Sequence, residues 1–390
     1  MTLPRLAVVC DFREENWPSM DLVAEMLLEQ LQSNHADEII AGRLCPPMRL
    51  RFTRDGRGSG RRFNADRLIN RFWDYPRLAR ARRNDFDLFH VVDHSYAQLL
   101  HQLPPERTIV TCHDLDTFRC LLEPAREPRS LAFREMMKRT LNGFRKAALV
   151  TCDSAATRES LLRHQLVEPE RAVVIHNGVH PLYTARPDPQ ADAEVDRLLG
   201  LAGAETIDLL HVGSTIERKR IDVLLKVFAA LCREFPKLRL IRVGGPFNAQ
   251  QAQLVEQLKL DERVVVMPAL ERRQLASVYR RAAVVLLPSE REGFGLPVVE
   301  SLASGTPVAA SDLPVLREVG QDAVLFCRAG EIEEWTKSVA GLLRERSRQP
   351  AQWAERRDLG FRQAARFSWA EYARKMVSLY RRLSASALDQ

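Results

Sequence analysis

The stretch AVVLLPSEREGFGLPVVESLASG, residues 283–305, contains one strand, one turn and one helix. Its apolar run, 283–287, is short and continuous, as in a parallel strand that is buried on both faces. Pro297 suits the first turn of a helix, where its missing N–H costs nothing. Glu292 and Glu300 therefore flank a strand-to-helix turn, at the sheet edge where α/β proteins bind their ligands.

Short apolar runs and amphipathic stretches alternate along the whole chain. Strands are expected at 6–10, 88–92, 108–112, 148–152, 172–175, 207–212, 238–243, 264–267, 284–287, 308–310 and 323–326. Amphipathic helices separate most of them, as at 20–32, where Ser19 is expected to be the N-cap. Strands that alternate with helices predict parallel sheets covered on both faces.

The length of the chain favours two domains, because 390 residues are too many for one ordinary core. The pattern loosens near residue 185, where prolines and aspartates gather. We predict two doubly wound α/β domains, at 1–184 and 207–366, joined by a linker at 185–206. Since such domains bind ligands beyond the carboxyl ends of their strands, the cleft between them is the expected site.

Composition indicates a soluble globular chain, with 45% hydrophobic and 28% charged residues. No apolar run approaches the roughly 20 residues of a membrane span. The first apolar run stops at Asp11 and is too short for a signal-peptide core. The seven cysteines are scattered without paired metal-ligand spacing, so we expect reduced thiols in a cytoplasmic protein.

Basic charge gathers in one segment of the chain. Residues 49–83 hold 12 arginines, three aspartates and no glutamate, within a net charge of +7. Such a segment suits nucleic acid, anionic lipid or a phosphorylated substrate. A solvated arginine-rich insertion is an equal alternative. No nucleic-acid motif accompanies the arginines, so nucleic acid is not an expected partner.

The turn quoted first suits a ligand that is rich in hydroxyl and phosphate groups. Gly293 and Gly295 let the backbone approach a ligand closely. The N–H groups of Phe294, Gly295 and Leu296 lie at a helix N-terminus, which favours anions. Carboxylates on either side are good acceptors for the paired hydroxyls of a ribose or a hexose.

This segment resembles the E-x7-E motif of retaining glycosyltransferases that have the GT-B fold and belong to family four. The resemblance implies two Rossmann-like domains, with Glu292 on hydroxyls of the donor sugar and Glu300 on the ribose of the nucleotide. It also implies that the backbone between them meets the sugar and the diphosphate. A strand-turn-helix link with a glycine-rich turn and no such role is the alternative.

A second segment, from Gly213 to Arg220, is similar to the V-G-R-x5-K-G pattern of the same family. The resemblance implies that Lys219 neutralises the donor phosphates. Ser214 stands where an arginine is frequent, and Arg218 is expected to supply the guanidinium instead. A cation beside a glycine turn suits a diphosphate. A basic surface turn is the alternative.

Four further matches are weaker. Gly244 lies in a turn that resembles the family's V-G-x-G-P, on the nucleotide side. His113 matches a histidine near the reacting carbon, where a neutral imidazole could hydrogen-bond a sugar hydroxyl; otherwise a lone histidine after a strand is structural. Asp114 and Asp116 look like a D-x-D metal motif, but relatives of this type use none, so neither an essential metal nor a cofactor is expected. The last helix, 367–390, fits one that packs back on the first domain.

The largest departure from the family follows the first strand. Many relatives have a Gly-Gly turn there, whereas the loop after Asp11 has no glycine and carries Trp17. We predict an acceptor-side loop, in which Trp17 stacks on a sugar ring and Asn16 hydrogen-bonds hydroxyls, with Asp114 on the same side. The alternative is that Trp17 only staples the loop to the following helix.

The residues and the resemblance together imply a retaining, metal-independent glycosyltransferase. It would move a hexose from a nucleoside-diphosphate sugar to a hydroxyl acceptor: a glycan, a lipid-linked sugar or a small molecule. The alternatives are a degenerate protein that binds nucleotide sugar without turnover, a GT-B epimerase or phosphorylase, and a dinucleotide-dependent oxidoreductase, for which the G-x-G-x-x-G fingerprint is missing. The segment 49–83 adds the hypothesis of a lipid-linked or anionic acceptor and of contact with an anionic membrane at its inner face.

Overall fold

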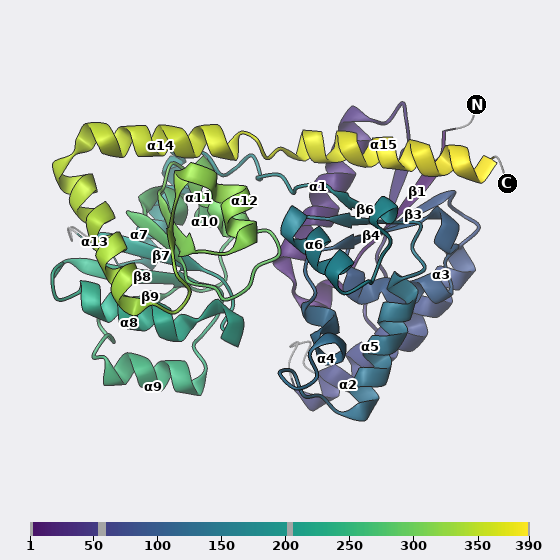
Figure 1. The fold of residues 1–390 in the computed structure, drawn as a ribbon, viewed down its shortest axis with the longest axis horizontal. Coiled ribbons are helices and arrows are strands. Elements are labelled where there is room, and N and C mark those ends of the chain that lie inside the picture. Colours follow the sequence, from purple (N-terminus) through teal and green to yellow (C-terminus); the bar gives the residue numbers. More distant parts are fainter. Residues whose placement is uncertain (1–2, 54–59, 201–205, 389–390) are drawn as a thin grey trace. The chain divides into compact units, whose positions relative to one another are not determined.

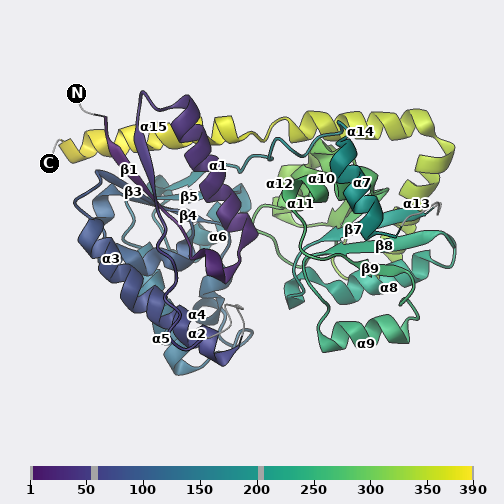
Figure 2. The same ribbon diagram turned by 180° about the vertical axis from the view of Figure 1, so that it is seen from behind.

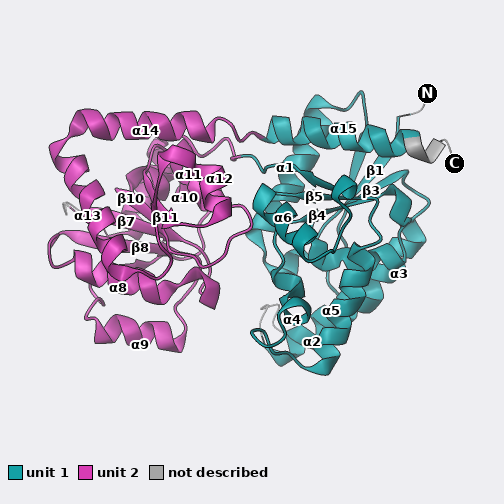
Figure 3. Cartoon of the chain, in the orientation of Figure 1, with its two compact units in different colours: residues 1–178, 369–390 teal, residues 179–368 magenta. Residues whose placement is uncertain are grey.

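The protein consists of two compact units, which Figure 3 shows in separate colours. Unit 1 comprises Met1–Gly178 and Trp369–Gln390, and unit 2 comprises Val179–Ser368. Each unit contains a six-stranded sheet, and every strand pairing is parallel. The two predicted doubly wound α/β domains are therefore confirmed. The computed structural model describes residues 3–53, 60–200 and 206–388.

The sheet of unit 1 has the strand order β2-β1-β3-β4-β5-β6. Its strands are β1 (Arg5–Val9), β2 (Ile40–Leu44), β3 (Leu88–Val91), β4 (Thr108–Cys112), β5 (Leu149–Cys152) and β6 (Ala172–Val174). Its helices are α1 (Pro18–Asn34), α2 (Arg61–Ile69), α3 (Tyr75–Arg82), α4 (Arg119–Leu122), α5 (Leu131–Phe144), α6 (Ala155–Arg163) and α15 (Trp369–Leu388), shown in Figures 1 and 2. The order reverses between β1 and β3, so the loops after these two strands meet.

The sheet of unit 2 has the strand order β12-β11-β10-β7-β8-β9. Its strands are β7 (Ile207–Val212), β8 (Leu238–Val243), β9 (Val264–Val266), β10 (Val284–Leu287), β11 (Val308–Ser311) and β12 (Val324–Cys327). Its helices are α7 (Pro189–Leu198), α8 (Ile221–Leu231), α9 (Ala249–Gln257), α10 (Arg272–Arg281), α11 (Leu296–Ala303), α12 (Pro314–Gly320), α13 (Ile332–Arg348) and α14 (Pro350–Ala364). In chain order this is the 3-2-1-4-5-6 arrangement of dinucleotide-binding folds, with the reversal between β7 and β10.

Strand β10 shows why its sequence is continuously apolar. Val284 and Leu286 belong to the core that includes Trp335 of α13. Val285 and Leu287 alternate with them and point to the other face of the sheet. All four strand residues are fully buried. The strand is therefore covered on both sides, as predicted.

Three boundaries differ from or refine the sequence-based expectations. The units divide between Gly178 and Val179, and residues 189–198 of the predicted linker form helix α7, which packs on α10; residues 201–205 of that linker lie outside the described residues. Helix α1 begins at Pro18 with Trp17 as its N-cap, so the assignment of the cap to Ser19 was wrong. Pro18 favours this earlier start because proline suits the first helical position.

Candidate functional site

The site predicted in unit 2 lies at the reversal point of its sheet. Loops after the neighbouring strands β7 and β10 bring Lys219 and Glu292 together, and Lys219 Nζ donates to Glu292 Oε1 at 2.6 Å. Arg218 Nη1 lies 3.6 Å from Glu292 Oε2 and donates to the carbonyl oxygen of Arg291 at 2.9 Å. Residues 73 positions apart thus form one cluster of two cations and one carboxylate.

Glu292 is held as a charged carboxylate. Burial opposes the charge, but Lys219 and Arg218 outweigh it and keep the pKa of Glu292 below its ordinary value. The side chains of Glu292 and Lys219 are only 7% and 11% exposed. Removing one partner of a buried ion pair of this kind is costly, because it leaves the other charge buried and unpaired.

Two glycine turns lie next to this cluster. A Cβ on Gly213 would be 3.7 Å from Cδ of Lys219, so this turn adjoins the lysine. Gly244 has a φ of +130°, and a Cβ there would lie only 2.0 Å from the carbonyl oxygen of Gly213. Only glycine fits at Gly244, because the two turns pack directly against each other.

The segment between the two glutamates forms the start of α11. Gly295 is the N-cap and has a φ of +97°, which favours glycine. The ring of Phe294 is buried and packs edge-on against Phe367, with the ring centroids 5.6 Å apart. Phe294 therefore contributes its backbone to this edge of the sheet, while Leu296 begins the helix.

Glu300 lies in the second turn of α11 and faces two tyrosines. Tyr279 donates from its hydroxyl to Glu300 Oε2 at 2.8 Å, and Tyr183 packs edge-on against Tyr279. Burial raises the pKa of Glu300 to about 7, against the opposing effects of Tyr279 and Tyr183. Sequence reasoning missed both tyrosines, since they are far from the motif along the chain and no local pattern marks them.

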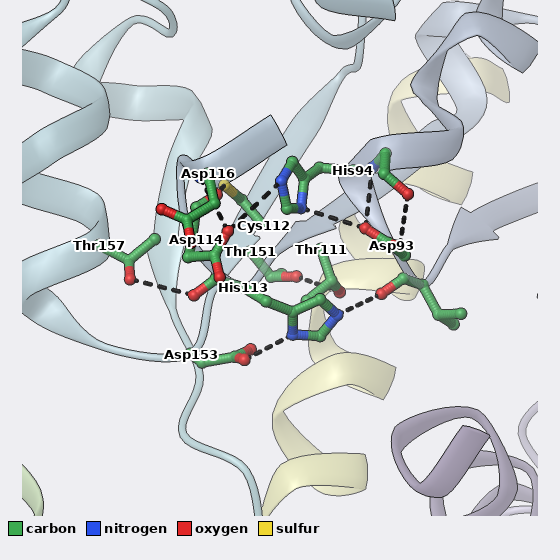
Figure 4. A network of polar contacts seen from close by, with 12 residues as sticks. Asp93, His94, Thr111, Cys112, His113, Asp114, Asp116, Thr151, Asp153 and Thr157 are labelled. Carbon is green, nitrogen blue, oxygen red and sulfur yellow. Dashed lines mark hydrogen bonds and ion pairs between the residues drawn. The ribbon is translucent and has the colours of Figure 1, made fainter. Parts of the chain in front are cut away.

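Two of the residues predicted in unit 1, His113 and Asp114, lie at the carboxyl edge of its sheet (Figure 4). His113 follows β4; its Nδ1 lies 2.6 Å from Asp153 Oδ2, and its Nε2 lies 2.7 Å from the carbonyl oxygen of Val92. Both partners are acceptors, so both ring nitrogens carry protons. Burial opposes this charge, but Asp153 outweighs it and raises the pKa of His113 to about 9. The neutral imidazole that we predicted is therefore wrong.

Asp114 lies beside His94, a residue that sequence reasoning missed. His94 Nε2 is 4.0 Å from Asp114 Oδ1, and His94 Nδ1 is 3.2 Å from Asp93 Oδ1 (Figure 4). Asp93 and His94 follow β3, which is the strand at the reversal point. A polar pair directly after a buried strand is the signal that could have identified them.

Asp11 and Asp93 face each other across the reversal point of unit 1. Burial and the neighbouring Asp93 raise the pKa of Asp11. For Asp93, burial is outweighed by His94 and His113, which lower its pKa to about 2. Asp93 is therefore held as a carboxylate, whereas burial and the neighbouring Asp93 disfavour the charged form of Asp11.

The loop after β1 leaves its predicted acceptor-side residues open to solvent. Trp17 is 49% exposed, and its Nε1 donates to Glu15 Oε2 at 3.3 Å. Asn16 is exposed and has a φ of +55°. The exposure of Trp17 leaves both its predicted role as a stacking surface and the stapling alternative open.

The described parts of the arginine-rich segment, residues 49–53 and 60–83, belong to unit 1, and residues 54–59 lie outside the described residues. The segment forms α2, a π-helical turn (Asn70–Asp74) and α3, which were not predicted. Arg71 donates to the carbonyl oxygen of Ser95 at 2.5 Å and stacks over Tyr96, so at least this arginine is structural. Four large apolar side chains of the segment are exposed: Leu50, Phe52, Leu68 and Trp73.

Metal-binding clusters and membrane-spanning helices are both absent from the described residues. These residues contain no group of three or more His, Cys, Asp or Glu side chains arranged to hold a metal ion. Nor does any described helix combine the length and the apolar character needed to cross a membrane. All seven cysteines are free thiols.

The strand orders and the two reversal points define a two-unit fold of the GT-B class, and comparison with known proteins agrees. Sucrose-phosphate synthase from Thermosynechococcus elongatus has a TM-score of 0.77 at 20% identity, over 98% of this chain and 100% of that one. Anabaena Alr3699/HepE, solved with UDP and glucose, has a TM-score of 0.70 at 16% identity, over 96% and 99%. At these identities the likeness concerns the fold.

Two family profiles match successive parts of the sequence. Residues 22–181 match Glycosyltransferase Family 4, and residues 201–358 match Glycosyl transferases group 1. The chain belongs to the family-four glycosyltransferases with the GT-B fold.

Among curated proteins, the D-inositol 3-phosphate glycosyltransferase of Nocardia farcinica is 36% identical over 248 residues, which are 60% of this chain and 52% of that protein. The protein of the same name from Thermobispora bispora is 35% identical over 224 residues, or 54% and 50%. The chain spans about half the length of these curated relatives.

Proposed function

We propose that this protein is a retaining glycosyltransferase that moves a hexose from a nucleoside-diphosphate sugar to a hydroxyl acceptor. The observation that carries the proposal is the cluster of Lys219, Arg218 and Glu292 at the reversal point of unit 2, beside two glycine turns. Structural neighbours that were solved with UDP and UDP-glucose support a nucleotide-sugar donor.

In this proposal each group of unit 2 has one task. Lys219 and Arg218 neutralise the diphosphate, and their charge stabilises it as it departs. Glu292 accepts hydrogen bonds from the hexose hydroxyls, and Glu300 accepts them from the ribose. The backbone from Gly293 to Leu296 faces the sugar and the diphosphate at a helix N-terminus. Attack on the face that the diphosphate leaves follows from the family and not from these contacts.

The acceptor side is assigned to unit 1. Trp17 offers an aromatic face, while Asn16 and Asp114 offer polar groups for hydroxyls. His113 takes a changed role, because both of its N–H groups are engaged. In this proposal the protonated ring of His113 is a fixed positive charge that orders the carboxyl edge of the sheet in unit 1. The curated relatives are named for D-inositol 3-phosphate, a phosphorylated polyol, which supports a polar or anionic acceptor.

The first experiment measures thermal stability of the full chain with UDP, GDP, ADP and dTDP, and with their common sugars. A ligand at about 100 times its dissociation constant adds roughly 2.7 kcal/mol to the free energy of unfolding. We expect one diphosphate to stabilise the wild type, to do so equally in EDTA, and to fail with Lys219→Ala and Glu300→Ala. Transfer to acceptors is then tested with the matching nucleotide sugar, and the anomeric configuration of the product tests retention.

Three other results would redirect the proposal. Stabilisation without transfer to any of a panel of polyols, glycans and lipid-linked sugars favours a nucleotide-sugar-binding protein without turnover. Stabilisation that EDTA abolishes contradicts a metal-independent reaction. Failure of every diphosphate to stabilise the wild type contradicts the donor site itself.

Contact with an anionic membrane at its inner face is part of the same proposal. Exposed Trp73 and Phe52 lie in a segment rich in arginine, a combination that suits the interface of an anionic bilayer. We expect flotation with vesicles that contain phosphatidylglycerol and not with neutral vesicles, and loss of flotation in Arg61→Glu/Arg62→Glu. The control, Arg346→Glu/Arg348→Glu on α13, reverses the same charge on unit 2. Equal flotation with both vesicles, or equal loss in both variants, contradicts this contact.

A further inference from the structure

Unit 2 contains a buried basic side chain that the proposed donor site does not use. Arg242, next to last in β8, is fully buried. Its Nη2 donates to the carbonyl oxygen of Gly213 at 2.9 Å, and its Nη1 donates to the carbonyl oxygen of Gly245. One guanidinium thus ties together the two glycine turns that follow β7 and β8.

No acidic side chain among the described residues forms an ion pair with Arg242. The side chain lies over the ring of Phe247, with Cζ 5.2 Å from the ring centroid, and burial lowers the pKa of Arg242 to about 10. Arg239 on the same strand differs, because it pairs with Asp208 at 2.8 Å. A buried cation without an acid costs free energy. Of the two arginines of β8, Arg239 is therefore neutralised by Asp208, whereas Arg242 has no counter-ion among the described residues.

The residue opposite Arg242 is a second buried basic side chain. His211 of β7 is fully buried, and within the described part of the chain neither of its ring nitrogens has a hydrogen-bond partner. Its Cε1 lies 3.2 Å from the position that a Cβ on Gly213 would take. Burial, together with Arg242 and Lys219, holds the pKa of His211 well below its ordinary value. Two basic side chains, Arg242 and His211, thus lie beneath the glycine turns.

The hydrogen bonds of Arg242 also fix the direction of a backbone donor. In a trans peptide the N–H points opposite to the C=O. Because the carbonyl oxygen of Gly213 points to Arg242, the N–H of Ser214 points away from it. The guanidinium therefore orders the turn and adds positive charge on its inner side, while the N–H is left on the outer side.

We propose that Arg242 is a positioning residue for the diphosphate of the donor, which it serves by holding both glycine turns and by leaving a positive charge that the bound anion balances. The inference rests on the proposed donor site in unit 2. It adds a residue that does not touch the ligand and that is separate from the Lys219 cluster. The ligand class that it selects is an inorganic or nucleoside pyrophosphate.

The test compares Arg242→Met, Arg242→Lys and Arg239→Met with the wild-type full chain. Arg239→Met is the matched control, since it removes a largely buried arginine from the same strand. Calorimetry measures the Kd of three ligands: inorganic pyrophosphate, the nucleoside diphosphate that stabilises the wild type, and the nucleoside with the same base. We expect Arg242→Met to weaken pyrophosphate and nucleoside diphosphate about tenfold or more, with a shallower salt dependence, and to leave the nucleoside unchanged. Arg239→Met should leave all three unchanged.

A purely structural role gives a different pattern. Equal loss of nucleoside and nucleoside diphosphate in Arg242→Met overturns the inference, as does unaltered pyrophosphate binding. If Arg242→Met does not fold, Arg242→Lys decides, because it keeps the charge but cannot donate to both carbonyls in the same geometry; an unchanged Kd for pyrophosphate then overturns the inference. If the wild type itself binds no diphosphate, the proposed donor site is rejected together with the inference. If the wild type binds a diphosphate and only the pattern of the variants differs from expectation, the inference about Arg242 fails alone, so the two failures are distinguishable.

Discussion

At the scale of single residues, His113 shows how a hydrogen-bond pattern fixes a charge. Its ring lies between a carboxylate and a backbone carbonyl, so only the doubly protonated form satisfies both. Such a ring cannot accept a hydrogen bond from a substrate. What it can do is hold Asp153 and the end of β3 in place, beside Asp93 and His94.

This charge predicts a pH dependence of stability. The folded pKa of His113, about 9, is above the ordinary value of 6.5, so its contribution is fully present below pH 6.5 and is lost as the pH rises through 9. The loss amounts to at most about 3 kcal/mol. Urea unfolding from pH 6 to 10 should show this decline in the wild type and a flatter profile in Asp153→Asn. Asp85→Asn, a surface carboxylate of the same unit, is the control; if Asp153→Asn declines as steeply as the control, the predicted charge is wrong.

Glu300 predicts a pH dependence of binding with the opposite sign. Its pKa of about 7 means that it gains a proton as the pH falls below 7 and then loses acceptor capacity for ribose hydroxyls. The groups that face it are Tyr279, Tyr183 and Arg272, and burial raises the pKa of both tyrosines above their ordinary value, so neither tyrosine titrates between pH 5 and 8. We expect nucleoside affinity to fall, at most about tenfold per pH unit, below pH 7, and Glu300→Gln to bind weakly at every pH. A nucleoside is used because phosphates titrate near pH 6 themselves. A pH-independent Kd in the wild type would be the contrary result.

At the scale of elements, the turn after β8 is the most constrained part of unit 2. A Cβ at Gly244 would stand 2.0 Å from the carbonyl oxygen of Gly213, at a φ of +130°. We expect Gly244→Ala to destabilise the chain by about 2 kcal/mol or more. Gly341 lies in α13, where an added Cβ would have no neighbour within 4 Å, so Gly341→Ala should stabilise by about 0.5–1 kcal/mol. Denaturant midpoints measure both, and equal effects would contradict the packing of the two turns.

Elements were predictable from sequence where their signal is local. Every expected strand is present, because each is a short run dominated by apolar residues, even where polar side chains interrupt it as in β7 and β8. Strand β2 was missed because its sequence, Ile40–Leu44, includes a glycine and an arginine and is partly exposed. Helices α2 and α3 were missed because their many arginines obscure the apolar periodicity of the sequence, although Phe63 and Tyr75 are buried.

The site was predictable only in part, for the same reason. Lys219 and Glu292 follow neighbouring strands, and the strand order brings them together. Tyr279 reaches Glu300 through packing between segments that are distant in sequence. No local pattern marks such a partner, since its role depends on which helix packs against which. Asp153 directly follows β5, as Asp93 follows β3, so its position after a buried strand could have identified it.

At the scale of the whole molecule, the chain completes its first unit with its last helix. Helix α15 packs against α1 and β3, and the hydroxyl oxygen of Tyr380 lies 2.7 Å from His90 Nδ1. Six of its described side chains are almost fully buried: Trp369, Tyr372, Ala373, Met376, Val377 and Tyr380. Unit 1 is therefore built from two segments, whereas unit 2 is continuous.

This organisation predicts that truncation affects the two units differently. Burying one large apolar side chain contributes about 1.5–3 kcal/mol, and a domain is stable by only about 5–15 kcal/mol. Ending the chain at Ser368 should therefore unfold unit 1 and leave unit 2 folded. Hydrogen exchange should show lost protection in β1, β3 and β4 and retained protection in β7, β8 and β10. The control is the full chain with Arg374→Ala/Lys375→Ala, which removes exposed charges of α15 and should keep both units protected. Retained protection of unit 1 in the truncated chain would show that α15 is an accessory to this unit and not part of its core.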